Sequence, residues 1–349
     1  MTFHAIGLMS GTSLDGLDIC YAFFERNQNA HWNYRIIHAE TVSYPTAWER
    51  RLKKSILLKA EDLYQLNSDY GFYLGEKTKD FIRKHSIEKT DVIGSHGHTV
   101  FHQPQKKYTV QIGDGRAIRL LTDIPVIYDF RSQDVLMGGN GAPLVPAGDR
   151  LLFGEYDACL NLGGFSNISF EHEGKRIAFD ISPVNTVLNF FAQKKKVKYD
   201  ENGNLAKSGT INSAVLKKLN ALKFYRQKPP KSLGIEWVNR EIFPLLKKLT
   251  TEDALATFTE HSAEQISTVF ENYGLNNILI TGGGAYNKYL IERIREKSST
   301  SLIIPEKETV DFKEALIFAF MAVLKINGEN NVLSSATGST KDHCTGLQA

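Results

Sequence analysis

Glycine, hydroxyl and acidic residues follow an apolar segment close to the amino terminus. The apolar run ends at Met9, and glycines at 11 and 16 bracket two hydroxyl side chains. Glycine lets backbone amides approach an anion, hydroxyls add donors, and carboxylates can hold a metal ion through water. These are the properties of a phosphate-binding loop, although an ordinary hairpin turn favours the same residue types. The candidate phosphate-contacting residues are Gly11, Thr12, Ser13, Leu14, Asp15, Gly16, Leu17 and Asp18. Of these, Leu14 and Leu17 would contribute only backbone and packing.

Two later turns have a similar composition. Gly163 and Gly164 follow an apolar segment at 158–162, and Gly282, Gly283 and Gly284 follow another at 278–280. We expect the first to present amides to phosphates and the second to let an adenosine lie against backbone at a helix start. A plain strand-to-helix turn would also explain the triple glycine. The order of the three turns favours a nucleotide site.

The elements that must position these turns occur in the same order twice. Each half opens with a three-stranded meander that has a glycine-rich turn after its first strand, and helices and strands follow. In the first half we expect, after the opening strand, strands at 19–24, 34–42, 92–95, 109–112 and 126–128, and helices at about 46–58 and 61–84. In the second half we expect strands at 158–162, 167–171, 176–181 and 278–280, and helices over 187–191, about 250–273 and from about 287.

Composition narrows the class of protein. A chain of 349 residues is long for one hydrophobic core, which favours two domains. The formal net charge of +3 offers no broad basic face for nucleic acid. The first residues do not resemble a signal peptide and no window is apolar enough for a membrane span, so we expect a cytoplasmic protein. Three scattered cysteines argue against a disulfide framework or a zinc site, and we expect the first two to be buried free thiols.

Short motifs along nearly the whole chain resemble the anhydro-N-acetylmuramic acid kinase family, within the sugar kinase, hsp70 and actin superfamily. Any one of them is weak evidence, but their shared order is specific. The motifs are GLMSGTSLDGLD (7–18), SHGHTVFHQP (95–104), QIGD (111–114), DFRSQDV (129–135), GAPLVP (141–146), NLGGFSNI (161–168), FDISPVN (179–185), PKSLG (230–234) and TGGGAYN (281–287).

The resemblance implies an α/β fold of two similar lobes that face each other over a nucleotide cleft. Each lobe would be a mixed five-stranded sheet with helices. Lobe one would comprise residues 1–139 and 310–349, and lobe two residues 140–309. The implied activity is ATP-dependent opening of the 1,6-anhydro ring with phosphorylation of O6, which yields N-acetylmuramic acid 6-phosphate in cell-wall recycling. ATP and Mg²⁺ are the implied cofactors, with Asp15, beside Asp18, as the candidate that orients the metal through water.

The resemblance also assigns a base. Asp180 occupies the Phe-Asp position of the family's general base, at the end of a predicted strand. A helix-capping or turn aspartate is the alternative. The family usually has glycine at the positions of Ser182 and Val184, and a valine resists positive φ. These departures leave open how closely this backbone approaches a ligand.

Other residues are implied to contact the sugar. Arg131 could pair with the lactyl carboxylate of a muramic acid, or instead form a salt bridge with Asp129 or Asp134. His96 and Thr99 would form hydrogen bonds to the sugar. Their neighbours His98, which stands where glutamine is usual, and His102 have a spacing that can imitate a metal site, but no acidic or cysteine partners cluster near them. Glu314, at the head of a predicted apolar helix, would be a second acidic group, although helix N-termini favour glutamate in any case.

Two other functions remain as alternatives. The chain could be a kinase of the same superfamily for another sugar, or a nucleotide-binding relative without catalysis. The expected partners are a small amino sugar and ATP, with no nucleic acid and no membrane. The sequence leaves the oligomeric state open, and a homodimer is one arrangement it allows.

Overall fold

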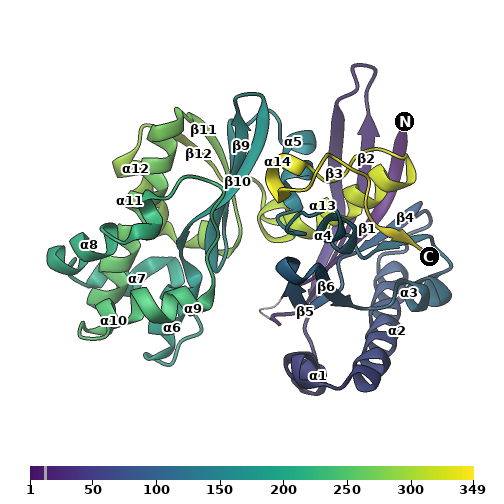
Figure 1. Cartoon of the computed structure of the whole chain (residues 1–349), viewed down its shortest axis with the longest axis horizontal. Coiled ribbons are helices and arrows are strands. Elements are labelled where there is room, and N and C mark those ends of the chain that lie inside the picture. The colour runs from purple at the N-terminus through teal and green to yellow at the C-terminus, as the bar shows by residue number, and fades with distance from the viewer. Residues whose placement is uncertain (12–13) are drawn as a thin grey trace. The chain divides into compact units, whose positions relative to one another are not determined.

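The computed structural model describes residues 1–11 and 14–349 (Figure 1). Contacts between residues divide the chain into two compact units. The first unit comprises Met1–Leu152 and Phe312–Ala349, and the second comprises Phe153–Asp311. Both units combine mixed sheets with helices, so the expected α/β fold class is confirmed.

The first boundary lies later than the expected 139/140. Helix α5 (Val145–Leu152) belongs to the first unit, where Asp149 forms a buried ion pair with Lys313 at 3.1 Å. Gly148 of the same helix lies so close to Ile317 that an added Cβ would come within 2.7 Å of its side chain. These contacts keep α5 with the first unit, and the chain passes to the second unit after Leu152.

The first unit contains a mixed sheet in the order β13-β7-β4-β1-β2-β3. Strands β1 to β3 form the predicted antiparallel meander, and β4 and β7 continue the sheet in parallel. The resemblance implied five strands, and the short β13 adds a sixth because the carboxyl-terminal segment returns to pair with β7. The strands are β1 (Thr2–Ser10), β2 (Leu17–Arg26), β3 (Trp32–Val42), β4 (Val92–Ser95), β7 (Val126–Tyr128) and β13 (Leu347–Gln348).

Helices cover both faces of this sheet. A Cβ on Gly7 of β1 would come within 1.8 Å of the carbonyl oxygen of Ala315, so α13 (Lys307–Ile326) packs directly on the strand backbone. Successive side chains of a strand point to opposite faces. The neighbouring Ile6 therefore faces the other side, where it belongs to a core that includes residues of α2 (Ala60–Lys84).

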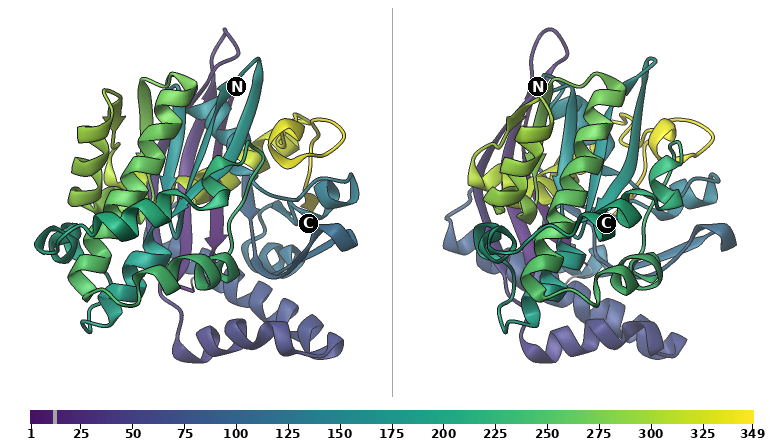
Figure 2. Two further views of the ribbon diagram at one scale, coloured as in Figure 1. Left: turned by 60° about the vertical axis from the view of Figure 1, so that its left-hand side comes forward. Right: turned by 90° about the vertical axis from the view of Figure 1, so that its left-hand side faces the viewer.

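The remaining elements of the first unit lie around the six-stranded sheet and its helices α2 and α13. Figures 1 and 2 show α1 and α2 at one end of the first unit, below the strands of its main sheet. The two predicted helices are confirmed, whereas β5, which pairs with β6 in a separate two-stranded sheet, was not predicted. These elements are α1 (Thr46–Lys54), η1 (Ser55–Leu57), β5 (His98–Gln103), η2 (Pro104–Lys106), β6 (Tyr108–Ile112), α3 (Gly115–Thr122), α4 (Ser132–Leu136) and α14 (Ser334–Thr337).

The second unit contains a five-stranded mixed sheet in the order β10-β9-β8-β11-β12, as expected. Strands β8, β9 and β10 form the second predicted meander, and β11 and β12 are parallel to β8. The strands are β8 (Ala158–Leu162), β9 (Phe165–His172), β10 (Lys175–Pro183), β11 (Asn277–Thr281) and β12 (Ser301–Ile303).

Helices pack on this sheet around α11 (Thr251–Tyr273), which agrees with the prediction of about 250–273. The side chain of Thr250 accepts a hydrogen bond from the Asp253 amide and caps the helix, and Gly274 ends it with a φ of 63°. The other helical elements are α6 (Asn185–Gln193), η3 (Glu201–Gly203), α7 (Asn204–Ser208), α8 (Ser213–Asn220), η4 (Lys223–Arg226), α9 (Ile235–Trp237), η5 (Val238–Ile242), α10 (Phe243–Leu246), η6 (Gly283–Tyr286) and α12 (Lys288–Lys297).

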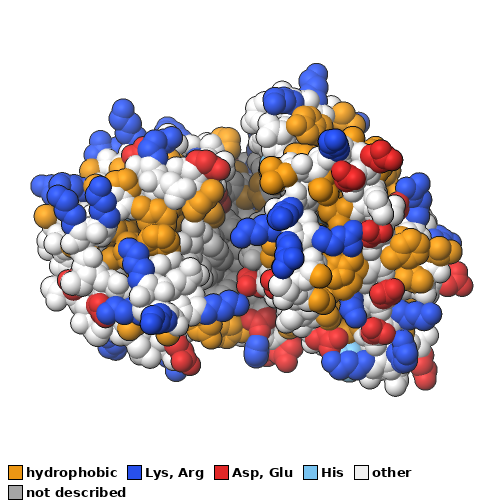
Figure 3. Space-filling view, turned by 90° about the horizontal axis from the view of Figure 1, so that it is seen from below, with side chains coloured by type: hydrophobic (Ala, Val, Ile, Leu, Met, Phe, Trp, Pro, Cys, Tyr) orange, Lys and Arg blue, Asp and Glu red, His pale blue; other side chains and the backbone are white. Residues whose placement is uncertain are grey.

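The distribution of charged side chains and the burial of two cysteines agree with what the composition predicts. On the face drawn in Figure 3, basic, acidic and hydrophobic side chains are interspersed. Cys20 and Cys159 are buried free thiols, as predicted. Across residues 1–11 and 14–349, the structure contains no helix that could cross a membrane.

Candidate functional site

The first glycine-rich turn connects β1 to β2. Ser10 and Leu17 form the last pair of this hairpin, so residues 11–16 make the loop, and Thr12 and Ser13 lie outside the described residues. Gly16 has a φ of 152°, and an added Cβ would come within 2.9 Å of the Val42 carbonyl oxygen. Strands β1 and β2 therefore pair as an antiparallel hairpin on either side of this loop, and Gly16 brings the backbone close to β3.

The other residues of this segment divide into packing and polar groups. Leu17 is fully buried and Leu14 packs against the same core, in agreement with the packing roles expected for them. Asp15 is exposed, and the Asp18 carboxylate accepts a hydrogen bond from the Thr41 hydroxyl at 2.5 Å. Carboxylate oxygens are the ligands that Mg²⁺ prefers, so the chemistry of Asp15 and Asp18 fits a magnesium ion held through water.

The second turn, at Gly163 and Gly164, forms hydrogen bonds that could not be predicted from the sequence. The Gly163 carbonyl accepts a hydrogen bond from the Asn185 amide at 3.2 Å. The Gly164 carbonyl accepts hydrogen bonds from the amides of Val184 and Thr186, at 2.8 and 3.1 Å. These bonds connect the turn to the start of α6. Both glycines thus position the chain that follows the predicted base.

The three glycines of the third turn are not equivalent. A Cβ on Gly282 or Gly284 would lie within 3.0 Å of Leu162, at the end of β8, and Gly282 also has a φ of 82°. Among the described residues, a Cβ on Gly283 would meet only the Asn185 side chain, at 3.8 Å. Packing therefore explains Gly282 and Gly284, whereas no described residue fills the space beside Gly283.

Asp180 lies near the end of β10, beside a β-bulge between positions 180 and 182. Its Oδ2 accepts a hydrogen bond from the Leu233 amide at 2.8 Å, and its own amide donates to the Lys231 carbonyl at 3.1 Å. Burial raises the pKa of this carboxyl to about 6, and the Leu233 hydrogen bond acts in the opposite direction. A carboxylate with such a pKa is suited to accept a proton near neutral pH.

The segment at 230–234 is thus a neighbour of Asp180, which the sequence analysis did not anticipate. Lys231 lies over the ring of Phe224, with Nζ 4.7 Å from the ring centroid, and over that of Phe179 at 5.7 Å. Burial lowers the pKa of Lys231. The lysine side chain is therefore held by aromatic rings, while its own carbonyl and the Leu233 amide contact Asp180 of β10.

The two family glycines are replaced without a positive φ. Neither Ser182 nor Val184 has a positive φ, and Val184 has a φ of −133° and a ψ of −93°. The Ser182 amide donates to the Ser166 hydroxyl at 3.1 Å, and the Ser166 hydroxyl donates to the Ser182 carbonyl at 2.9 Å. The serine is therefore held between β9 and β10 in ordinary extended backbone.

Arg131 and His96 form a pair in the first unit. The Arg131 Nε and Nη2 groups lie 3.0 and 2.8 Å from His96 Nε2, and Nη1 donates to the Gly141 carbonyl at 2.6 Å. Because Nε2 accepts, Nδ1 of His96 carries the proton and donates to the Gly97 carbonyl at 2.9 Å. Burial, reinforced by Arg131, keeps the pKa of His96 well below its usual value. Both ring nitrogens are therefore engaged, and this geometry lets His96 orient Arg131 rather than bond a sugar directly.

The salt bridges considered as alternatives for Arg131 are not formed among the described residues. Asp134 accepts from the Thr337 hydroxyl and the Gly141 amide, both at 2.7 Å, and Asp129 accepts from the Ser132 amide at 3.2 Å. Burial lowers the pKa of Arg131 to about 10, against the opposing effects of Glu314 and Asp134. Of the five guanidinium N–H groups, one on each terminal nitrogen lies outside the three bonds described above. Two guanidinium donors thus remain for a further acceptor, and paired donors on the terminal nitrogens of an arginine can bind a carboxylate.

The other predicted sugar residues differ in their surroundings. The Thr99 hydroxyl accepts a hydrogen bond from Gln111 Nε2 at 3.2 Å, between β5 and β6. Glu314 lies inside α13, because this helix begins at Lys307 rather than near Lys313 as predicted. The preference of helix N-termini for glutamate therefore does not explain it. Burial raises the pKa of Glu314. No cluster of three or more metal-binding side chains occurs in residues 1–11 and 14–349.

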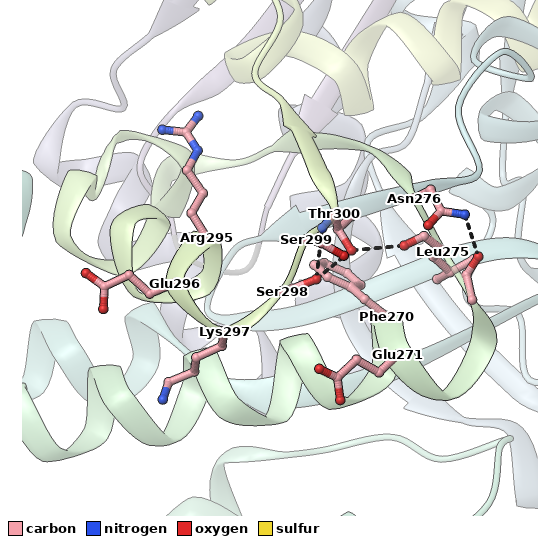
Figure 4. A pocket seen from close by; sticks show the side chains of 11 residues that line it. Phe270, Glu271, Leu275, Asn276, Arg295, Glu296, Lys297, Ser298, Ser299 and Thr300 are labelled. Atoms are coloured by element: carbon pink, nitrogen blue, oxygen red, sulfur yellow. Dashed lines mark hydrogen bonds between the residues drawn. The ribbon is translucent and has the colours of Figure 1, made fainter.

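A polar cavity of about 460 Å³ lies elsewhere in the second unit, between the ends of α11 and α12 (Figure 4). The hydroxyls of Ser298 and Thr300 in its wall bond each other at 2.6 Å, and Thr300 also donates to the Leu275 carbonyl. No predicted site residue lines this cavity. The predicted chemistry therefore does not involve it.

Comparison with known proteins decides the family. A family model described as anhydro-N-acetylmuramic acid kinase matches residues 3–348. The chain belongs to the anhydro-N-acetylmuramic acid kinase family. It is therefore a carbohydrate kinase, and ATP is the phosphoryl donor that this membership implies. The predicted family and class of enzyme are confirmed.

Individual relatives agree with this assignment. The anhydro-N-acetylmuramic acid kinase of Francisella tularensis subsp. novicida is 33% identical over 369 residues, covering 96% of this chain and 96% of that protein. The enzyme of the same name from Bacillus cereus is 30% identical over 368 residues, again with 96% of each covered. A solved ROK family glucokinase from Streptomyces griseus, in complex with glucose and AMPPNP, has a TM-score of 0.41 and 11% identity, covering 92% of this chain and 98% of that chain.

Within this kinase the structure brings some predicted residues together. The turns at 163–164 and 282–284 meet at the end of β8, where the Asn185 side chain also donates to the Leu162 carbonyl at 3.2 Å. In the first unit, Arg131 joins His96 and is influenced electrostatically by Glu314. Asp180 is joined instead by the segment 230–234, a motif to which the sequence analysis gave no role in the chemistry.

Proposed function

We propose that the protein uses ATP and water to convert anhydro-N-acetylmuramic acid into N-acetylmuramic acid 6-phosphate, a step of cell-wall recycling in the cytoplasm. The family match across residues 3–348 carries this proposal. The chain's own residues supply the required groups: a carboxylate suited to act as a base, a guanidinium that can bind a carboxylate, and three glycine-rich turns for a nucleotide.

Asp180 acts as the general base. It takes a proton from the water whose oxygen forms a bond to the anomeric carbon. The bond between that carbon and O6 breaks, O6 forms a bond to the γ-phosphorus, and the bond from that phosphorus to ADP breaks. The proton on Asp180 then passes to solvent. A pKa of about 6 keeps Asp180 mostly ionised at neutral pH while it remains basic enough to accept this proton.

Arg131 binds the sugar through its lactyl carboxylate. The remaining N–H group on each terminal nitrogen pairs with one carboxylate oxygen, and His96 fixes the plane of the guanidinium. The Thr99 hydroxyl forms a hydrogen bond to the sugar. Glu314 supplies a second acidic group, whose raised pKa favours its protonated form more than is usual for a glutamate.

The glycine-rich turns bind ATP. Residues 11–18 contact the phosphates, Gly163 and Gly164 present further backbone, and Gly282 to Gly284 accept the adenosine, with the open side of Gly283 toward it. Asp15 and Asp18 would hold Mg²⁺ through water, and the ion would neutralise charge on the phosphates.

One assay tests the proposal. The purified protein is incubated with magnesium ATP and anhydro-N-acetylmuramic acid in water enriched in heavy oxygen, and the products are weighed by mass spectrometry. We expect a sugar heavier by one water and one phosphate, with the label on the anomeric hydroxyl. A panel of other anhydro and reducing amino sugars identifies a kinase of different specificity. Nucleotide binding without product from any sugar would indicate a relative that lacks catalysis.

A further inference from the structure

A chain of buried hydroxyl groups ends at the residue that precedes the first glycine-rich loop. The Tyr44 hydroxyl donates to Ser10 Oγ at 2.8 Å, and Tyr44 and Tyr70 hydroxyls lie 2.6 Å apart. Tyr44 has a single proton, which it gives to Ser10, so Tyr70 must donate to Tyr44. Ser10 Oγ is also 3.4 Å from Nδ1 of His98. The order of donation is therefore fixed from Tyr70 through Tyr44 to Ser10.

These groups come from separate elements. Ser10 is the last residue of β1, Tyr44 follows β3, Tyr70 lies in α2 and His98 begins β5. All four side chains are buried. Burial raises the pKa values of both tyrosines and lowers that of His98 to about 4, so all four groups are neutral at physiological pH. Neutral, bonded groups of this kind hold one arrangement without the cost of a buried charge.

The end of β3, just before Tyr44, contacts the other arm of the loop. The Thr41 hydroxyl donates to the Asp18 carboxylate at 2.5 Å, and a Cβ on Gly16 would come within 2.9 Å of the Val42 carbonyl oxygen. Thr41 and Val42 thus meet the arm that enters β2, while Tyr44 meets the arm that leaves β1. Both arms of the loop are held from one short stretch of chain.

We propose that residues 41–44, the loop support, position the two described ends of the loop, Ser10 and Gly11 on one side and Gly16 on the other, for the phosphates of the nucleotide, with Tyr44 and Ser10 as positioning residues. The proposal rests on the proposed function, because it assumes that this loop binds ATP. The hydroxyl of Tyr44 fixes the end of β1 and hence the place where the loop backbone begins. The helical segment that carries Tyr70 contributes to ATP binding through this bond.

The structure offers a matched control. Tyr73 lies in the same aromatic cluster, with its ring centroid 5.9 Å from that of Tyr44 and 6.1 Å from that of Tyr70. Its hydroxyl is buried but has no hydrogen-bond partner among the described residues. Tyr44→Phe and Tyr73→Phe therefore remove the same atom from the same cluster, and only Tyr44→Phe removes the contact with Ser10.

The experiment compares the wild-type kinase with Tyr44→Phe, Tyr73→Phe and Ser10→Ala. It measures KM for magnesium ATP and for the sugar, the dissociation constant of a non-hydrolysable ATP analogue, and the melting temperature. In Tyr44→Phe the Tyr70 hydroxyl loses its acceptor and Ser10 its donor, and we expect KM for ATP and the analogue's dissociation constant to rise about tenfold. KM for the sugar should remain within about twofold. Ser10→Ala should resemble Tyr44→Phe, and Tyr73→Phe should resemble the wild type.

The outcomes separate the two proposals. If Tyr44→Phe and Ser10→Ala melt lower but bind the analogue as the wild type does, the hydroxyl chain only stabilises the fold and the positioning role is wrong. Equal losses for ATP and sugar, or equal effects of Tyr44→Phe and Tyr73→Phe, also overturn it. If Tyr44→Phe does not fold, Ser10→Ala decides in the same way. A wild-type protein that binds no nucleotide would instead overturn the proposed function.

Discussion

The carboxylate of Asp180 accepts a hydrogen bond from the amide of Leu233 at 2.8 Å, across 53 positions of the chain. Burial raises the pKa of Asp180 to about 6, and the Leu233 bond limits the rise because it stabilises the charged form. The Lys231 carbonyl accepts from the Asp180 amide, so the same segment holds both the backbone and the side chain of the aspartate. This geometry fixes the direction in which one carboxylate oxygen points.

The first prediction concerns the base itself. Asp180→Asn keeps the shape of the side chain but removes its ability to take a proton. We expect kcat to fall by about 10²–10⁴-fold, the usual contribution of a general base, while the affinity for ATP stays close to that of the wild type. Steady-state kinetics and calorimetric titration with ATP measure the two quantities. Turnover near the wild-type value would show that another group takes the proton.

The second prediction concerns pH. Asp180 is active only when ionised, and its pKa is raised to about 6. We therefore expect kcat/KM to rise tenfold per pH unit below about pH 6 and to level off above it. Burial holds the pKa of His98 at about 4 and that of His96 well below its usual value, so neither histidine produces this limb. The control is His98→Gln, in which kcat/KM should fall below the same pH as in the wild type. If this fall moves to another pH or disappears, the titrating group is His98 and not Asp180.

The third prediction concerns the sugar's carboxylate. Arg131 has one N–H on each terminal nitrogen outside its bonds to His96 and Gly141, and these two can receive a carboxylate together. Arg131→Ala should raise KM for the muramic substrate by about 10–100-fold, the value of a charge-assisted pair, and leave the glucosamine analogue nearly unaffected.

Arg131→Lys provides the matched variant for this prediction. It keeps the charge but loses the fork, so it should recover only part of the affinity for the muramic substrate. Equal losses for the muramic and glucosamine sugars would exclude a contact between Arg131 and the lactyl group.

The sequence predicted those parts of the fold that depend on local pattern. The two meanders and helices such as α11 have clear apolar spacing, caps and glycine turns, so their existence could be inferred. Strand β5 was missed because, in the part of the chain that the structure describes, it pairs only with β6, outside the main sheet, and several of its residues are polar. The two-residue strand β13 depends on pairing with β7, which is distant in the chain, and no local pattern announces it.

In the candidate site, too, some residues could be predicted from the sequence and others could not. Asp180 and Arg131 could be named because they stand in family motifs. Their partners could not be inferred, because the bond to Leu233 spans 53 positions and that between Arg131 and His96 spans 35. Spacing along the chain carries no information about such contacts. The role of Gly284 in packing against Leu162 was equally hidden, because composition cannot distinguish a glycine needed for packing from one needed for a ligand.

The fourth prediction makes that distinction within the third glycine turn. A Cβ on Gly284 would come within 2.7 Å of the Leu162 Cβ and 2.8 Å of its carbonyl oxygen, both in the buried end of β8. Gly284→Ala should therefore lower the free energy of unfolding by about 1–3 kcal/mol, as overpacking does. A Cβ on Gly283 meets no described protein atom closer than 3.8 Å, so Gly283→Ala should melt within about 2 °C of the wild type.

The two alanine variants should therefore differ: Gly284→Ala should lose stability, and Gly283→Ala should lose affinity for ATP. If adenosine lies against the open side of Gly283, the added methyl group occupies its place, and KM for ATP should rise about tenfold in Gly283→Ala although the fold is intact. Gly284→Ala should bind ATP normally at temperatures well below its melting point. Thermal melting and KM for ATP, measured on both variants, test this. Normal ATP affinity in Gly283→Ala would mean that the nucleotide does not approach this glycine, and the triple-glycine turn would then serve only the packing of β8 against β11.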